Sequence, residues 1–116
     1  MYRVNLSNQN LTYVVESDLA VFNNLETLNV SENKLNFARL GALPGLKRLI
    51  MSLNDVKSLD LDVSGRFMNL TSLDLSFNSI NESAQILLAT LPCLQSLDLT
   101  CNNIATLSNK ILDVPQ

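Results

Sequence analysis

The chain has 116 residues, of which 47% are hydrophobic, so it can bury one modest core and is too apolar to stay disordered. No apolar run approaches the roughly 20 residues of a membrane span, and a net charge of −3 with scattered Lys and Arg gives no electrostatic footprint for nucleic acid. The chain lacks His, the usual acid–base group near neutral pH, while 24 Leu and 15 Asn dominate its composition.

One string of residues recurs along the whole chain. The pattern L-x-x-L-x-L-x-x-N-x-L, with conservative replacements, begins near residues 1, 25, 46, 70 and 94. Apolar and polar residues alternate in the centre of each copy, which predicts a short strand with its apolar side chains on the inner face. We therefore predict one domain over residues 1–116, with about five repeats and one strand per repeat in a parallel sheet.

The segments between the predicted strands differ from one another. Residues 17–22 are expected to form a short helical turn capped by Ser17, whereas Gly41 and Pro44 limit any helix in the second repeat. Residues 57–68 contain an alternation typical of a strand, but the repeat register places them on the convex side, and we follow the register. The best helix is predicted over Asn81–Leu91, with Asn81 as its N-cap.

Four of the repeats carry an asparagine directly after the predicted strand and its turn. We expect this residue to turn the chain, and its amide to satisfy backbone donors and acceptors there. Stacked copies predict a structural ladder made of Asn33, Asn54, Asn78 and Asn102. Gln9 interrupts the ladder in the first repeat, because its extra methylene puts the same hydrogen bonds in question.

The outward strand residues and those beside the turn are predicted to line a concave face that binds a partner protein. This face comprises Arg3, Asn5, Thr27, Asn29, Glu32, Arg48, Ile50, Leu53, Ser72, Asp74, Phe77, Ser96, Asp98 and Cys101. Its distinctive features are an apolar patch of Ile50, Leu53 and Phe77 and the like charges of Asp74 and Asp98, whose repulsion a basic partner would relieve.

A structural interpretation of the same residues stands beside the functional one. Asp74 and Asp98 belong to an L-D-L-S sequence that is an ordinary filling of this repeat, and Phe77 is also typical of a side chain that packs along the edge of the sheet. Lys47 and Arg48 fit a solvated rim equally well.

The residue inventory predicts neither catalysis nor a bound group. The chain has no Gly-rich phosphate loop and no Cys-x-x-Cys motif, and Asp60 and Asp62 have no partner acid or base. We expect no enzyme activity, no catalytic residue, no metal or cofactor, no small-molecule substrate, and no binding to nucleic acid or membrane.

The two cysteines and the ends of the sequence bear on compartment and completeness. Cys93 and Cys101 are expected to be free thiols in a reducing compartment, because a disulfide between them would span a stretch that is needed as a strand. Five N-x-S/T sequons are attributed to composition. No signal peptide is visible, and the lack of polar caps predicts either a segment of a longer protein or ends that a neighbour covers.

Several runs carry a more specific likeness. LNVSENKL at 28–35, LDLSFNSI at 73–80 and ILLATLPCLQSLDLTCNNIATL at 86–107, with the long repeat between them, resemble the leucine-rich region of X-ray radiation resistance-associated proteins. The resemblance implies an α/β leucine-rich repeat solenoid, right-handed, with short parallel strands on the concave face and helical or irregular returns on the convex face. It also implies a larger intracellular protein without known catalytic residues.

The function predicted from these observations is an intracellular, cytoplasmic scaffold for protein–protein interaction. A broader resemblance is to the short intracellular repeats of phosphatase regulators, dynein light chains and axonemal leucine-rich subunits. We expect a large cytoskeletal or ciliary assembly, with the nucleus left open as an alternative. Two other functions remain: a structural spacer that continues a longer solenoid, and a regulatory protein linked to the radiation or stress response. A secreted pattern-recognition receptor would require glycans and a disulfide, which we do not expect.

Overall fold

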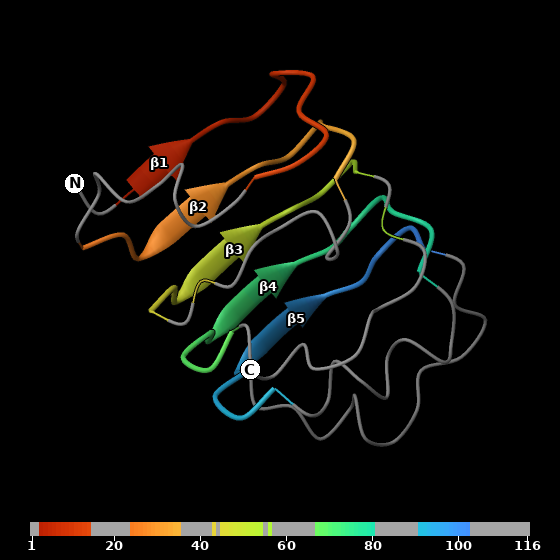
Figure 1. Cartoon of the computed structure of the whole chain (residues 1–116). Helices are drawn as coiled ribbons and strands as arrows, with labels where there is room; N and C mark the ends of the chain where they lie inside the picture. Colours follow the sequence, from red (N-terminus) through yellow and green to blue (C-terminus); the bar gives the residue numbers. More distant parts are fainter. Residues whose placement is uncertain are drawn as a thin grey trace.

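The computed structural model describes residues 3–14, 24–35, 43, 45–54, 56, 67–80 and 91–102. Within these ranges the chain forms the short strands β1 (Arg3–Asn5), β2 (Thr27–Asn29), β3 (Arg48–Ile50), β4 (Ser72–Asp74) and β5 (Ser96–Asp98). The strands lie side by side in one parallel sheet in the order of the sequence, as Figure 1 shows. The predicted solenoid with one parallel strand per repeat is confirmed.

The register of the sheet is the register of the repeat. The central residue of each strand pairs with the central residue of the next, so Val4 is opposite Leu28 and Leu73 is opposite Leu97. The shorter second repeat keeps this register, because Thr27 is opposite Arg48 as Arg3 is opposite Thr27. Differences in repeat length are therefore taken up outside the strands.

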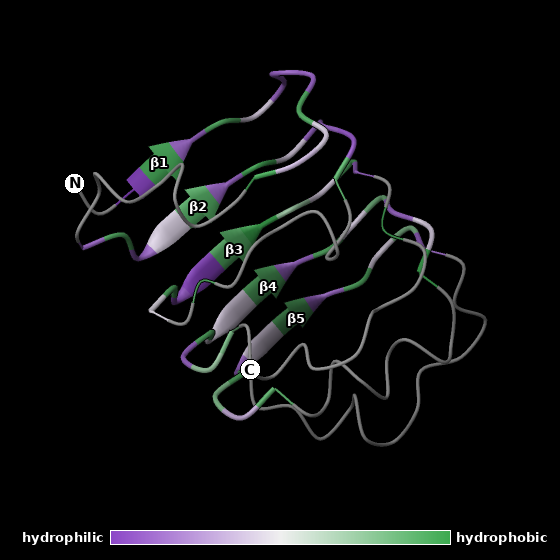
Figure 2. Ribbon diagram, in the orientation of Figure 1, coloured by the Kyte–Doolittle hydropathy of each residue, from purple (hydrophilic) through white to green (hydrophobic). Residues whose placement is uncertain are grey.

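The inner face of the sheet carries the core. The central residues of β2, β3 and β4 are buried, and Phe67 from the turn before β4 is fully buried with them. Figure 2 shows the apolar centre of every strand, flanked in most strands by polar residues. The core weakens at β5, where Leu97 and Leu99 are only partly buried. The described core comprises Val4, Val14, Leu28, Val30, Leu35, Leu43, Leu46, Leu49, Met51, Val56, Phe67, Leu70, Leu73, Leu75, Ile80, Leu91 and Leu94.

Backbone hydrogen bonds continue beyond the strands and join each repeat to the next. The N–H of Leu6 donates to the carbonyl of Asn29 at 2.7 Å, and the N–H of Met51 donates to the carbonyl of Asp74 at 2.8 Å. A second set lies nearer the turn, where the N–H of Leu53 donates to the carbonyl of Ser76 at 3.1 Å. Each repeat thus gains its backbone partners from its neighbours.

Most of the predicted return segments lie outside the described residues. This applies to the helical turn over 17–22, to Gly41 and Pro44, to the alternation within 57–66 and to residues 81–90 of the predicted helix. Leu43 and Leu91, which immediately precede two of the turns that lead into strands, are described and buried.

Candidate protein-binding surface

The face of the sheet opposite the core, here called the open face, carries the outward strand residues in two rows. The first row holds the residue that begins each strand: Arg3, Thr27, Arg48, Ser72 and Ser96. The second row holds the residue that ends each strand: Asn5, Asn29, Ile50, Asp74 and Asp98. All of these side chains are half-buried or exposed.

A third row, here called the corner row, follows three residues after the second row. It consists of Asn8, Glu32, Leu53, Phe77 and Cys101, and all of them are exposed. Together the three rows contain every residue that the sequence predicts for the binding face. The structure therefore brings the predicted residues together on one surface.

Four of the five side chains in the second row accept a hydrogen bond from the backbone N–H group two residues later. The side-chain Oδ1 of Asn29 accepts a hydrogen bond from the N–H of Ser31, two residues later, at 3.0 Å. The carboxylate Oδ1 of Asp74 accepts from the N–H of Ser76 at 3.0 Å and from its hydroxyl at 2.7 Å. Asn5 and Asp98 accept equivalent bonds. These hydrogen bonds use one carboxylate oxygen of each aspartate, as expected if the two aspartates stabilise the fold of the repeat.

Ile50 is the exception in this row. It occupies the position where the other four repeats present a side-chain oxygen, so Ser52 has no such acceptor two residues before it. Figure 2 shows this difference, since the tip of β3 is apolar while the tips of the other strands are polar. At this position the repeat lacks the local hydrogen bond of the other repeats, and the side chain of Ile50 is partly exposed instead.

The corner row has an unusual backbone conformation. All five residues have a positive φ, from 53° at Asn8 to 58° at Cys101. A left-handed residue at this point bends the chain, so the bend predicted at the asparagine involves the residue directly before it. Asn tolerates this conformation, whereas other L-residues are disfavoured there by roughly 1–2 kcal/mol. Sequence reasoning missed this feature, because Leu53 and Phe77 give no local signal for it.

The asparagines after the corner are held by dense hydrogen bonding. The Nδ2 of Asn78 donates to the carbonyls of Met51, Leu75 and Ser76 at 3.0–3.1 Å. Its Oδ1 accepts from the N–H groups of Asn54 and Val56 in the preceding repeat. Asn33 repeats this arrangement in full. Asn54 and Asn102 make the same donor contacts, and the Oδ1 of each accepts from one recorded N–H group, that of Leu35 or Ile80.

Gln9 stands at the ladder position of the first repeat and makes a different contact. Its Nε2 donates to the carbonyl of Ser7 at 3.1 Å, and its own N–H donates to the Oδ1 of Asn33. Gln9 thus keeps one of the donor contacts of the ladder asparagines, the one to the carbonyl two residues before it.

The corner row and the second row together contain the predicted apolar patch. Leu53 and Phe77 occupy the corner positions of adjacent repeats and are 48% and 53% exposed. Ile50 lies in the same repeat as Leu53 and pairs with Asp74 across the sheet. The patch therefore consists of Ile50, Leu53 and Phe77, and Asp74 in the second row lies beside it.

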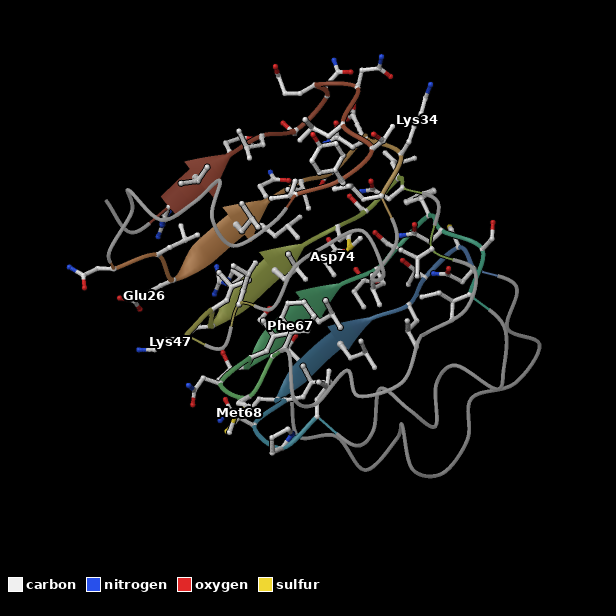
Figure 3. All side chains as sticks on the ribbon, viewed as in Figure 1. Glu26, Lys34, Lys47, Phe67, Met68 and Asp74 are labelled. Carbon is white, nitrogen blue, oxygen red and sulfur yellow. The ribbon has the colours of Figure 1, made fainter. Side chains whose placement is uncertain are left out.

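Charge on the open face is divided between the two ends of the strands. Arg3 and Arg48 stand in the first row, whereas Asp74 and Asp98 stand in the second. Within the described ranges the recorded ion pair joins Lys47 to Glu26 at 3.3 Å, and Figure 3 shows it at the starting edge of the sheet. The two aspartates have no ion pair among the described residues, and their charges are available to a partner.

The described part of the chain offers little other chemistry. No group of three His, Cys, Asp or Glu residues there could hold a metal ion. Cys93 and Cys101 are exposed free thiols. Among the described residues, no helix has the length and apolar character needed to cross a membrane.

Comparison with known proteins identifies the repeat. Residues 68–83 and 90–106 match the Leucine Rich repeat family. The chain is 36% identical over 104 residues to X-ray radiation resistance-associated protein 1 of Mus musculus, a match that covers 90% of this chain and 13% of the relative. It is also 36% identical over 107 residues to the adenylate cyclase of Schizosaccharomyces pombe, covering 87% of this chain and 6% of that protein. The chain thus spans a small part of each relative, so neither match transfers the activity of the whole protein.

A solved structure gives the fold independently. A chain of the SNF/U2A′ complex of Drosophila melanogaster superimposes with a TM-score of 0.78 and 24% identity. The match covers 93% of this chain and 63% of that one.

Proposed function

We propose that this chain, a leucine-rich repeat protein that resembles the X-ray radiation resistance-associated family, is a non-catalytic scaffold that binds a protein partner on the open face of its sheet. The observation that carries the proposal is the open face itself. Its side chains are half-buried or exposed, while their backbone is fixed by the parallel ladder between repeats. A surface ordered before binding loses little conformational entropy when a partner docks.

The proposal also covers the compartment of the protein and the assembly to which it belongs. The free thiols of Cys93 and Cys101 favour a reducing, intracellular compartment. The cytoskeletal or ciliary assembly stays a prediction, without support from the relatives named above. A regulatory role in the radiation or stress response rests on the resemblance alone.

A structural spacer is the second candidate function, and β5 favours it. Leu97 and Leu99 are only partly buried, although their counterparts in the preceding repeat, Leu73 in β4 and Leu75 directly after it, are buried. Another repeat stacked on β5 would cover them, as successive repeats of a solenoid do. In that case the ends of the sheet matter more than its open face.

The experiment obstructs the open face with bulky side chains, so that its result does not depend on which residues of the partner make the contact. Ser72→Arg with Ser96→Arg places two bulky side chains on β4 and β5, at one end of the first row. The full-length protein is used to capture binding proteins from a lysate of cells that express it. The captured proteins are quantified by mass spectrometry for this variant and for wild type. Met68→Arg is the matched control, because Met68 is 54% exposed in the turn that precedes β4.

The two candidate functions predict different results. If the open face binds, at least one retained protein is lost with the Ser72→Arg/Ser96→Arg variant and kept with Met68→Arg, while circular dichroism is unchanged. If every partner is retained by both variants, the open face is not the binding surface. Loss of partners on truncation after Asn102 would then support the spacer.

A further inference from the structure

We infer that the patch of Ile50, Leu53 and Phe77, with Asp74 and Asp98 beside it, is a docking site for a basic protein segment that inserts a large apolar side chain. This inference rests on the proposed scaffold function and specifies the chemistry of the partner. It also selects one end of the open face, the part formed by β3, β4 and β5.

Three unusual positions meet in one place. Ile50 replaces the side-chain acceptor that the other four repeats present at its position. Leu53 and Phe77 place large apolar side chains at the left-handed corner, with φ of 56° each, where the other three repeats carry Asn, Glu and Cys. Sequences that fold well agree locally with their structure, and departures from that agreement concentrate at functional sites.

The two corner residues of the patch are exposed to solvent. Leu53 and Phe77 keep about half of their surface in contact with water, so the departures do not serve the core. They lie in adjacent repeats, whose strands are roughly 4.8 Å apart in a sheet. One large apolar side chain of a partner can therefore contact both residues, and Ile50 extends the contact toward the strand.

Two negative charges beside the patch specify the chemistry of the occupant. Asp74 pairs with Ile50 on one side and with Asp98 on the other, so both carboxylates stand next to the patch in the second row. Only the Oδ1 of each is used in the recorded hydrogen bonds, and neither aspartate has an ion pair within the described ranges. Lys or Arg side chains of a partner would relieve the repulsion between these like charges.

The geometry relates the apolar and the basic contacts. The corner row follows the second row by three residues, which is roughly 10 Å along an extended strand. A segment that crosses the strands thus meets the apolar corners on one side and the carboxylates on the other. The net charge of −3 on the chain also favours the approach of a basic partner.

The test uses a phage-displayed library of random peptides, selected on the full-length protein. Three variants report on the site. Leu53→Asn with Phe77→Asn removes the apolar corners and introduces a residue that tolerates their backbone conformation. Asp74→Asn with Asp98→Asn removes the charges and keeps the acceptor oxygen, as Asn29 shows. Glu32→Asn is the control, because Glu32 has φ 57° at the same corner position outside the patch.

The expected result is enrichment of peptides in which Lys or Arg flanks a large apolar residue. Their affinity should fall by roughly tenfold or more with the corner variant and by several-fold with the charge variant. The charge variant should also lose most of the salt dependence of binding, whereas Glu32→Asn should bind as wild type does. Thermal melting of each variant establishes that the folded state is retained.

Other outcomes overturn the inference in distinguishable ways. Enrichment of acidic or uncharged peptides that are lost with Ser72→Arg/Ser96→Arg refutes the basic partner and leaves the scaffold function standing. Binding that is insensitive to every open-face variant refutes both proposals. A dimer in sedimentation that dissociates with Leu53→Asn/Phe77→Asn identifies a second copy of the chain as the occupant and also refutes the inference.

Discussion

Asn78 illustrates how one residue type can hold a repeat together. Its amide donates within its own turn and to the preceding repeat, and its oxygen accepts two N–H groups of that preceding repeat. The residue is only 8% exposed, so water cannot readily replace these bonds. Neither Asp, which lacks the donor, nor Ser, which has only one, could satisfy the same set.

Replacing Asn78 by Ala should therefore destabilise the chain strongly. We expect a loss of about 3 kcal/mol or more, because several buried backbone groups would be left without partners at about 1–3 kcal/mol each. Asn102→Ala should cost about 1 kcal/mol, because Asn102 is half-buried and water can reach its turn. Urea denaturation of both variants provides the comparison, and equal losses would contradict this account of the ladder.

The corner row shows two opposing effects at Phe77. A left-handed Phe is disfavoured by roughly 1–2 kcal/mol relative to a conformation that suits it. Its buried half contributes about 1 kcal/mol, half of what full burial of such a side chain is worth. The two magnitudes nearly cancel, so the folded state gains little from having Phe rather than Asn at this position. We therefore expect Phe77 to contribute to binding and not to stability.

At the scale of the element, the strands are too short to be stable alone. Each has three residues, and its backbone partners lie in neighbouring repeats. Propensity contributes little over such a length, and isolated short strands are not stable in water. The strand is instead fixed by its central residue, which enters the core, and by the parallel ladder.

The central leucines of β4 and β5 offer a direct test of this view. Leu73 is 1% exposed, whereas Leu97 at the same repeat position is half-buried. Leu73→Ala should lose about 3 kcal/mol of unfolding free energy or more, and Leu97→Ala about half as much, because less apolar surface and a smaller cavity are involved. The midpoints of urea denaturation measure both, and an equal or larger loss at Leu97 would show that its surroundings are tighter than the structure indicates.

At the scale of the molecule, stability should be graded along the solenoid. Repeats contact only their neighbours, so an interior repeat has two stabilising interfaces and a terminal one has a single interface. In the 116-residue chain we expect the amide of Met51, bonded to the carbonyl of Asp74 at 2.8 Å, to exchange its hydrogen at least roughly tenfold more slowly than that of Ser96, bonded to the carbonyl of Thr71 at 3.0 Å.

Hydrogen exchange followed by NMR can resolve the two amides in one sample. Both amides are hydrogen-bonded, so a difference in their rates reports local opening and not the mere presence of a bond. Equal protection would mean that the chain unfolds as a single unit, and the partial exposure of Leu97 and Leu99 would then have no consequence for stability.

The repeat, the inner and outer faces of each strand and the rows of the open face follow from the order of the residues alone, because that order contains a period of two and a spacing of about 24 residues. The resemblance to leucine-rich proteins followed from the same order. The return segments 17–22 and 81–90 keep the status of predictions.

The task of each individual position depends on the packing of the folded chain. The hydrogen bonds that occupy Asp74 and Asp98, the missing acceptor at Ile50 and the left-handed corners at Leu53 and Phe77 could not be deduced from periodicity. The sign of φ at a non-glycine residue and the exposure of its side chain are set by how stacked neighbours bend the chain and satisfy its backbone. A leucine in the core and a leucine at a strained corner look the same in a sequence, and the surrounding repeats make the difference.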